Sequence, residues 1–156
     1  MYFLVNIVLA MAWAAMNGEI SPASLITGFV LGYLMLVITR RPLNSSRYVS
    51  KVPQVLYFVL YFLWELMQSN VRVAYEVLTP GHHMKPGIVA VPLDIDRDYQ
   101  IILLANMITL TPGTLSIDVS TDKQTLYVHS MYVEDVEEFR MSIKNGFERR
   151  IMELFR

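Results

Sequence analysis

The amino-acid sequence predicts a membrane α-helical N-terminal region, formed by a short helical hairpin and a third helix, followed by a small C-terminal α+β domain. Hydrophobic residues make up 54% of the chain and charged residues only 17%, whereas an ordinary soluble domain is about a quarter charged. The charges are also unevenly distributed, since residues 1–39 carry only Glu19 while residues 80–156 carry eight Lys or Arg and eleven Asp or Glu. We therefore expect the two parts of the chain to face different solvents.

Two short apolar runs predict the helical hairpin. The first covers residues 2–16 and the second residues 23–39, with Asn17-Gly18-Glu19 between them as a turn. Ser21 followed by Pro22 is typical of a helix N-cap and a first helical position. Both runs are short for a hydrocarbon core of roughly 30 Å, so the sequence allows either full or partial crossing of the bilayer.

Small residues recur at every fourth position along the second run, at Ser24, Gly28 and Gly32. Small side chains at this spacing let two membrane helices approach closely, which matters because lipid supplies no hydrophobic drive for helix association. We expect these three residues to form a helix-packing face against the neighbouring helix or against another subunit.

A third helix is expected from Pro53 to about Leu78, which extends the membrane-embedded region over residues 1–78. The preceding segment, residues 40–51, carries four basic and no acidic residues, which is typical of a cytoplasmic loop. A third helix that crossed the bilayer would place the C-terminal domain outside the cell, whereas a helix lying along the interface would keep it in the cytoplasm. Polar residues in the second half of this helix favour partial insertion or burial against partner subunits.

Glu65 is the only charged residue between Val52 and Val71. A carboxylate at membrane depth is a candidate for proton or cation handling. The alternative is that Glu65 reaches the headgroups or pairs with Arg72, two turns further along. Because proton routes usually need several such groups, a contribution of Glu65 to an ion path is the weaker interpretation.

The periodicity changes after a linker at residues 79–87, and we expect a soluble domain at residues 88–156. Alternating apolar residues predict strands, and apolar residues three and four positions apart predict helices. The order is strand, helix, strand, strand, helix, at residues 88–95, 99–110, 115–119, 125–133 and 135–155. This β-α-β-β-α order suits a three-stranded sheet with helices on one face, an incomplete ferredoxin-like layer.

Details of these elements can also be predicted. Pro92 indicates an edge position or a bulge for the first strand, and Asp96 or Asp98 is expected to cap the first helix of the domain. The terminal helix is amphipathic, with charged residues, Glu148 among them, expected on its solvated face.

The residue types and motifs of the chain do not indicate an active site. The chain contains no cysteine, which excludes disulfides, thiolate metal sites and cysteine nucleophiles. A net charge of −1 gives no indication of nucleic-acid binding. The acidic residues of the domain fall at predicted caps, turns and a solvated helix face, and no phosphate loop or nucleophile motif occurs. We therefore expect no enzyme activity and no catalytic, cofactor-binding or metal-binding residues.

The most distinctive stretch of the sequence runs from Asn106 to Val119. A helix end, a Pro-Gly turn and a strand entry follow one another here, with several hydroxyl groups available to satisfy open backbone carbonyls and amides. We interpret the stretch as a structural turn, with Asn106, Thr109, Thr111, Pro112, Gly113, Thr114 and Asp118 as its characteristic residues.

This stretch, together with residues 122–129 and 135–151, resembles the E subunit of Mrp-type multisubunit sodium/proton antiporters. The resemblance covers essentially the whole chain, from the apolar N-terminus through the basic loop and the third helix to the segment Ile108–Val119. It implies an accessory or assembly subunit of a complex that exchanges cytoplasmic Na⁺ or Li⁺ for external protons and supports pH homeostasis.

The resemblance also implies the location and the partners. The protein is expected in the bacterial plasma membrane as a multi-pass chain with a cytoplasmic C-terminal domain. Its implied partners are the other antiporter subunits and the lipid bilayer, with Na⁺ and H⁺ as the transported ions of the complex. Two further hypotheses are a direct contribution of Glu65 to the ion path and a stand-alone membrane-anchored domain that binds a cytoplasmic ligand.

Overall fold

The computed structural model describes residues 2–39, 46–79 and 84–156. Parts of the basic segment and of the predicted linker therefore lie outside the described residues. The chain divides into two compact units, residues 1–56 and 57–156. The boundary falls inside the third helix, so the second part of that helix belongs to the C-terminal unit.

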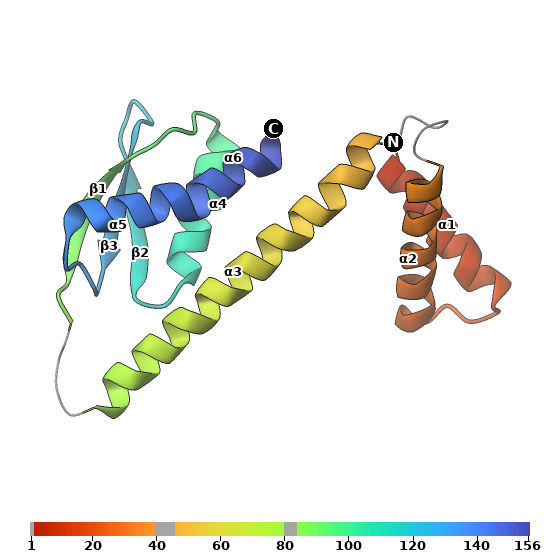
Figure 1. Ribbon diagram of the computed structural model, residues 1–156, viewed down its shortest axis with the longest axis horizontal. Helices are drawn as coiled ribbons and strands as arrows, with labels where there is room; N and C mark the ends of the chain where they lie inside the picture. The colour runs from red at the N-terminus through yellow and green to blue at the C-terminus, as the bar shows by residue number, and fades with distance from the viewer. Residues whose placement is uncertain (1, 40–45, 80–83) are drawn as a thin grey trace. The chain divides into compact units, whose positions relative to one another are not determined.

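Two helices, α1 (Tyr2–Met16) and α2 (Pro22–Ile38), form a helical hairpin in the N-terminal unit (Figure 1). The turn between them places Gly18 at φ +71°, a conformation that suits a residue without Cβ. Ser21 is the N-cap of α2, because its hydroxyl accepts a 3.1 Å hydrogen bond from the Ser24 N–H.

Among the described residues, no helix combines the length and the apolar composition needed to cross a membrane.

The third helix, α3 (Ser46–Leu78), begins before Pro53 and not at it, which corrects the predicted start. Proline in a helix interior leaves the carbonyl four residues earlier without its N–H partner. That carbonyl belongs to Val49, and it accepts a 3.1 Å hydrogen bond from the Tyr33 hydroxyl of α2. The contact with the hairpin therefore replaces the missing helical hydrogen bond and lets the helix extend through Pro53.

The C-terminal unit contains a three-stranded antiparallel sheet of β1 (Gly87–Pro92), β2 (Thr114–Val119) and β3 (Thr125–Ser130), in the order β1-β3-β2. The predicted three-stranded sheet is confirmed, and Pro92 lies in an edge strand as expected. One face of the sheet is buried, with Val89, Val91, Leu126 and Val128 almost inaccessible to solvent. The opposite face leaves side chains such as Ile88 and Tyr127 exposed.

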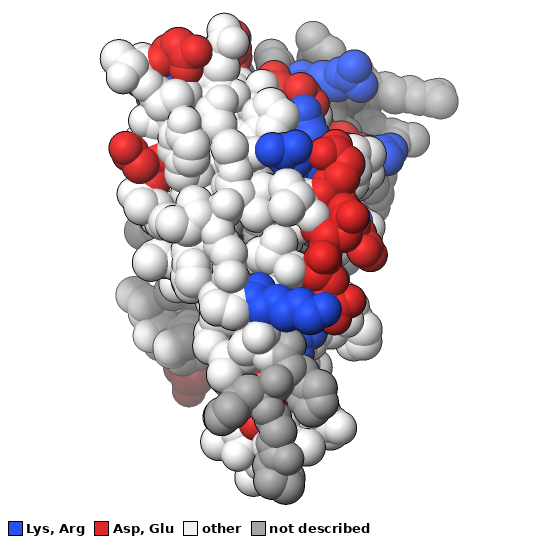
Figure 2. Space-filling view, turned by 90° about the vertical axis from the view of Figure 1, so that its left-hand side faces the viewer, with Lys and Arg blue, Asp and Glu red and all other residues white. Residues whose placement is uncertain are grey.

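Helices cover the buried face of the sheet. The first, α4 (Asp98–Leu110), contributes Leu104 and Ile108 to a core shared with the strands and with the terminal helical segment. Its N-cap is Arg97, without a side-chain hydrogen bond to the helix, and Asp98 lies in its first turn. The prediction that Asp96 or Asp98 caps this helix is therefore wrong. Figure 2 shows a face of the molecule on which most charged side chains lie along one side of a broad uncharged area, with a few acidic side chains at its other edge.

The predicted terminal helix consists of three pieces, α5 (Val136–Ile143), the π-helical turn η1 (Lys144–Glu148) and α6 (Arg149–Phe155). Asp135 caps α5 by accepting hydrogen bonds from the N–H groups of Glu137 and Glu138. The prediction of one regular helix is wrong at Gly146, whose φ and ψ of −82° and −106° are not helical. A Cβ at Gly146 would lie 3.2 Å from the Tyr61 hydroxyl oxygen, so the turn closes on α3.

Candidate functional site

The two glycines of the predicted packing face lie directly against α1. A Cβ at Gly28 would come within 2.8 Å of the Trp13 Cβ and 2.9 Å of the Ala10 backbone. A Cβ at Gly32 would overlap the side-chain oxygen of Asn6. Only a residue without a side chain permits this approach of α2 to α1. The hydroxyl of Ser24, the third small residue, is buried without a hydrogen-bond partner.

Asn6 is the polar centre of the N-terminal unit. Its side chain is fully buried, and its amide nitrogen donates a 3.0 Å hydrogen bond to the Tyr48 hydroxyl of α3. Its side-chain oxygen has no partner in the structure. An unpaired buried polar atom costs free energy, so the Asn6–Tyr48 contact favours one specific arrangement of the helices over many apolar alternatives.

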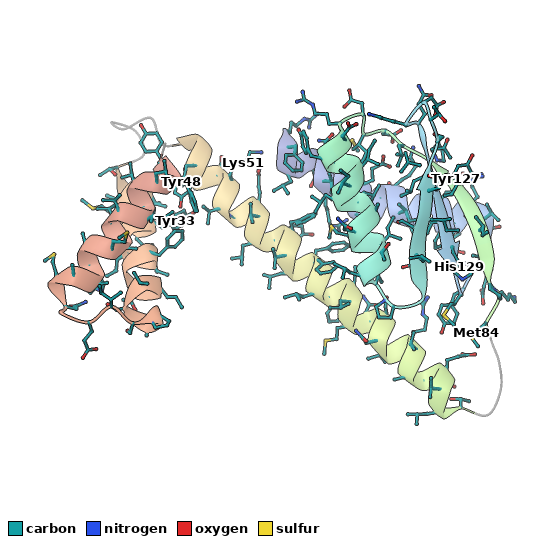
Figure 3. All side chains as sticks on the ribbon, turned by 180° about the vertical axis from the view of Figure 1, so that it is seen from behind. Tyr33, Tyr48, Lys51, Met84, Tyr127 and His129 are labelled. Atoms are coloured by element: carbon teal, nitrogen blue, oxygen red, sulfur yellow. The ribbon has the colours of Figure 1, made fainter. Side chains whose placement is uncertain are left out.

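Aromatic rings form a cluster with Tyr48, the hydrogen-bond partner of Asn6. The Tyr48 ring lies 6.2 Å from the ring of Tyr33 and 6.3 Å from that of Phe3, and Phe3 in turn lies 6.3 Å from Phe29. Figure 3 shows Tyr33 and Tyr48 close together, contributed by α2 and α3. The sequence analysis missed this cluster. The signal that marks it is a single amide side chain within the apolar run of residues 2–16.

Glu65, the candidate ion-path residue, lies half-buried on α3. The Tyr61 hydroxyl, one turn earlier on the same helix, forms a hydrogen bond with its carboxylate. Arg72, the residue proposed to pair with Glu65, has its guanidinium 5.5 Å from the ring centroid of Tyr132. The structure therefore places Glu65 beside Tyr61, within the C-terminal unit.

Arg150 joins this part of α3 to the π-helical turn. Its guanidinium lies 3.5 Å from the ring centroid of Tyr61 and donates 2.9 Å hydrogen bonds to the carbonyls of Asn145 and Gly146. Phe147 packs against the same tyrosine with the ring centroids 5.7 Å apart. Stacking and hydrogen bonding by one guanidinium thus stabilise the irregular turn where the helix contacts it.

Glu148 is fully buried, so the prediction that it lies on a solvated helix face is wrong. The kink at Gly146 inside the π-helical turn is the physical reason, because its non-helical φ and ψ rotate the residues after it out of the regular helical phase. One carboxylate oxygen accepts hydrogen bonds from the N–H groups of Asp94, at 2.6 Å, and Ile95, at 3.2 Å. The other oxygen has no partner.

Burial raises the pKa of Glu148 above its ordinary value of 4.5. The hydrogen bonds from Asp94 and Ile95 oppose this shift because they favour the ionised form. Two charged groups lie nearby: Asp94 raises the pKa further, and Lys144 lowers it. Lys144 and Asp94 form a 2.8 Å ion pair with each other.

The hydroxyls of the distinctive stretch satisfy the end of α4. Thr111 donates a 2.8 Å hydrogen bond to the Met107 carbonyl. Thr114 donates to the carbonyls of Ile108, at 2.6 Å, and Thr111, at 2.9 Å. Thr109 accepts a 3.1 Å hydrogen bond from the Ser116 N–H. These contacts fix the geometry of the connection from α4 to β2.

The remaining characteristic residues of the stretch lie in the turn, on α4 and on β2. Gly113 takes φ +90°, which favours glycine, and its carbonyl accepts a 2.8 Å hydrogen bond from the Met131 N–H. Pro112 lies in the turn, and Asn106 is exposed on α4. Asp118 follows an irregularity in the pairing of β2, and its carboxylate accepts a hydrogen bond from the Val119 N–H.

Among the described residues, no group of three or more His, Asp or Glu side chains is arranged to hold a metal ion.

Comparison with known proteins identifies the family. The chain matches the model of a family described as Na⁺/H⁺ ion antiporter subunit (MNHE) over residues 6–154. It is 38% identical to the E subunit of the Na⁺/H⁺ antiporter of Bacillus subtilis (strain 168) over 153 residues, which cover 98% of this chain and 97% of the relative. This chain belongs to the family of Na⁺/H⁺ antiporter E subunits. The E subunit of Alkalihalophilus pseudofirmus is 35% identical over 151 residues, covering 97% of this chain and 96% of the relative.

Two solved structures are similar to this member of the E-subunit family. A chain of the Mrp complex from Dietzia sp. DQ12-45-1b is 25% identical, with a TM-score of 0.51 over 65% of this chain and 96% of that chain. A chain of the membrane-bound sulfane sulfur reductase, an archaeal respiratory membrane complex, is 28% identical, with a TM-score of 0.59 over 99% of this chain and 98% of that chain.

Proposed function

We propose that this chain is the accessory and assembly subunit of a multisubunit Na⁺(Li⁺)/H⁺ antiporter in the bacterial plasma membrane. The observation that carries the proposal is the similarity to the E subunit of Bacillus subtilis, which extends over 98% of this chain and 97% of the relative. A match that leaves almost nothing unaligned on either side supports a shared role for the entire protein. The partners of the chain are then the other subunits of the antiporter.

The hairpin of α1 and α2 is the membrane-embedded part in this proposal. Apolar side chains remain exposed on both helices, including Leu4, Val8 and Met11 on α1 and Ile26 on α2. An apolar groove of about 990 Å³ between them is lined by residues such as Phe29. Exposed apolar surface of this kind marks contact with lipid or with another apolar protein surface.

The C-terminal domain belongs in the cytoplasm in the same proposal. The support comes from the segment at residues 40–51, which carries four basic and no acidic residues, together with an α3 that does not cross the bilayer and so keeps the domain on the side of this loop. Basic loops of this length are retained on the cytoplasmic side of bacterial membranes.

The side-chain geometry supports an assembly role more than a place in the ion path. Gly28 and Gly32 are in close contact with α1, and the threonines of the distinctive stretch hydrogen-bond to backbone groups. Glu65 accepts a hydrogen bond from the Tyr61 hydroxyl, which holds its carboxylate beside the C-terminal domain. These contacts stabilise helices and a turn.

An affinity pull-down tests this function. The tagged chain is recovered in mild detergent from membranes that also contain the candidate antiporter subunits, and the companions are identified by mass spectrometry. We expect several larger membrane proteins of the antiporter to co-purify. Recovery of this chain alone would contradict the proposal and favour a stand-alone membrane-anchored binding domain.

A further inference from the structure

The two sides of α3 differ in chemistry over residues 56–78. With 3.6 residues per turn, the charged residues of this part lie on the side of the helix that contacts the C-terminal domain. They are Glu65, Arg72 and Glu76, and they share that side with Phe58, Tyr61 and Phe62, which pack on the domain core. The opposite side carries an exposed apolar stripe, which comprises Leu56, Leu60, Leu63, Met67, Val71 and Leu78.

The contacts of α3 with the domain determine how the helix can meet a bilayer. The domain contacts the helix at Tyr61, through Phe147, and again at Arg72, through Tyr132. These two positions are eleven residues, or about 16 Å, apart along the helix. A helix that crossed the membrane here would carry the open sheet edges and the charged surface of the domain into hydrocarbon, where neither is tolerated.

We propose that the apolar stripe of α3 lies on the surface of the lipid bilayer, with the helix parallel to the membrane plane. Leu56 and Leu78 are 22 residues apart, so the stripe extends over about 33 Å. Asn70 is a polar residue close to the stripe, and its amide donates a 2.7 Å hydrogen bond to the Leu66 carbonyl of the same helix. All six residues of the stripe are apolar, so the stripe itself carries no hydrogen-bonding side chain.

Aromatic residues fit the lipid surface at one border of the stripe. Trp64 and Tyr75 are 59% and 63% exposed, and such rings favour the headgroup region, where one end is apolar and the other is wet.

This inference rests on the proposed function, because it places the helix on the cytoplasmic surface of the membrane that holds the antiporter. The chain contains no cysteine, so single cysteines can carry a nitroxide label. We would label Leu60→Cys, Leu63→Cys, Met67→Cys and Val71→Cys, with Gln68→Cys as the matched control outside the stripe. The chain is purified with its co-purifying subunits and reconstituted in liposomes of phosphatidylethanolamine and phosphatidylglycerol, with the complex of the unsubstituted chain as background.

The measurement is the collision rate of each label with molecular oxygen, which partitions into lipid, and with a water-soluble nickel chelate. We expect all four stripe labels to favour oxygen several-fold over the chelate, at one shallow depth of about 5–10 Å below the headgroups. The Gln68→Cys label is expected to favour the chelate. Four independent positions keep the test valid if one labelled variant fails to fold.

Two outcomes would overturn the inference. Depth that increases steadily from position 60 to position 71 would show a crossing helix. Protection of the stripe from both oxygen and the chelate would show that a protein surface covers it. The two proposals fail separately. If the chain purifies without other antiporter subunits, the proposed function is wrong, but labels exposed to lipid would still support the placement of α3 on the bilayer surface.

Discussion

The backbone N–H of Asp94 donates a 2.6 Å hydrogen bond to the carboxylate of Glu148, a residue with no solvent exposure. The same oxygen accepts from the buried N–H of Ile95. One side chain of the π-helical turn thus satisfies the two backbone donors that follow β1. This contact connects the terminal helical segment to the sheet.

We predict that Glu148→Leu destabilises the protein whereas Glu148→Gln does not. Leucine fills a similar volume but leaves the buried N–H of Ile95 without an acceptor, at a cost of about 1–3 kcal/mol. Glutamine keeps an oxygen in place of the acceptor and is the matched control. The measurement is the unfolding midpoint of the purified full-length chain in detergent. Equal midpoints for the leucine variant and the parent would contradict the role assigned to this hydrogen bond.

The raised pKa of Glu148 gives a prediction for the dependence of stability on pH. The folded state binds this proton more tightly than the unfolded state, so its stabilising contribution is full below pH 4.5 and is lost as pH rises through the raised folded pKa. Glu148→Gln removes the titrating group. We therefore expect the variant to gain stability relative to the parent as pH rises from 4.5 through the raised pKa of Glu148 in the folded state.

Denaturant unfolding of both proteins across this pH range measures the effect. The ion pair of Lys144 with Asp94 is unchanged in sequence in both proteins, so the comparison varies only the side chain at position 148. A constant difference between the two curves would show that the folded and unfolded states bind the proton of Glu148 equally.

Local sequence patterns predicted the elements of the C-terminal domain well, because alternation and helical spacing depend on neighbouring residues. The three strands, their antiparallel sheet and the edge position of Pro92 follow from such patterns. The end of α4 at the Pro-Gly turn follows from them too, since it depends on residues within one short segment.

The errors arose where a distant residue decides the local structure. The π-helical turn closes on Tyr61 at Gly146, and helical spacing within residues 135–155 carries no information about that contact. Pro53 lies within α3 because Tyr33 satisfies the free carbonyl of Val49. The sequence singled out Glu65 but missed Asn6 and Glu148, whose importance depends on burial by partners far along the chain.

Gly28→Leu is expected to weaken the hairpin and the recovery of partner subunits. The new side chain would have to displace the backbone of Ala10, and overpacking of this kind costs about 1–3 kcal/mol. Thr27→Leu adds the same side chain at the neighbouring, exposed position and serves as the control. The readout is the amount of each partner in the pull-down relative to this chain. Unchanged recovery with Gly28→Leu would count against a packing role for this face.

Glu65→Gln separates an assembly role from a place in the ion path. Glutamine has nearly the same shape and retains an oxygen that accepts the hydrogen bond from Tyr61, but it cannot bind and release a proton. We expect the variant to co-purify with the antiporter and to leave exchange unchanged, measured as the Na⁺-dependent collapse of a pH gradient in everted membrane vesicles.

Tyr61→Phe completes the comparison, because it removes the hydrogen bond to Glu65 and leaves the carboxylate. If Glu65 acts through packing, Tyr61→Phe reduces co-purification more than Glu65→Gln does, and exchange falls only in proportion to the complex recovered. The opposite pattern is loss of exchange in a fully assembled Glu65→Gln complex with normal exchange in Tyr61→Phe. That result would place the carboxylate of Glu65 in the route of the transported ion and overturn the purely structural role.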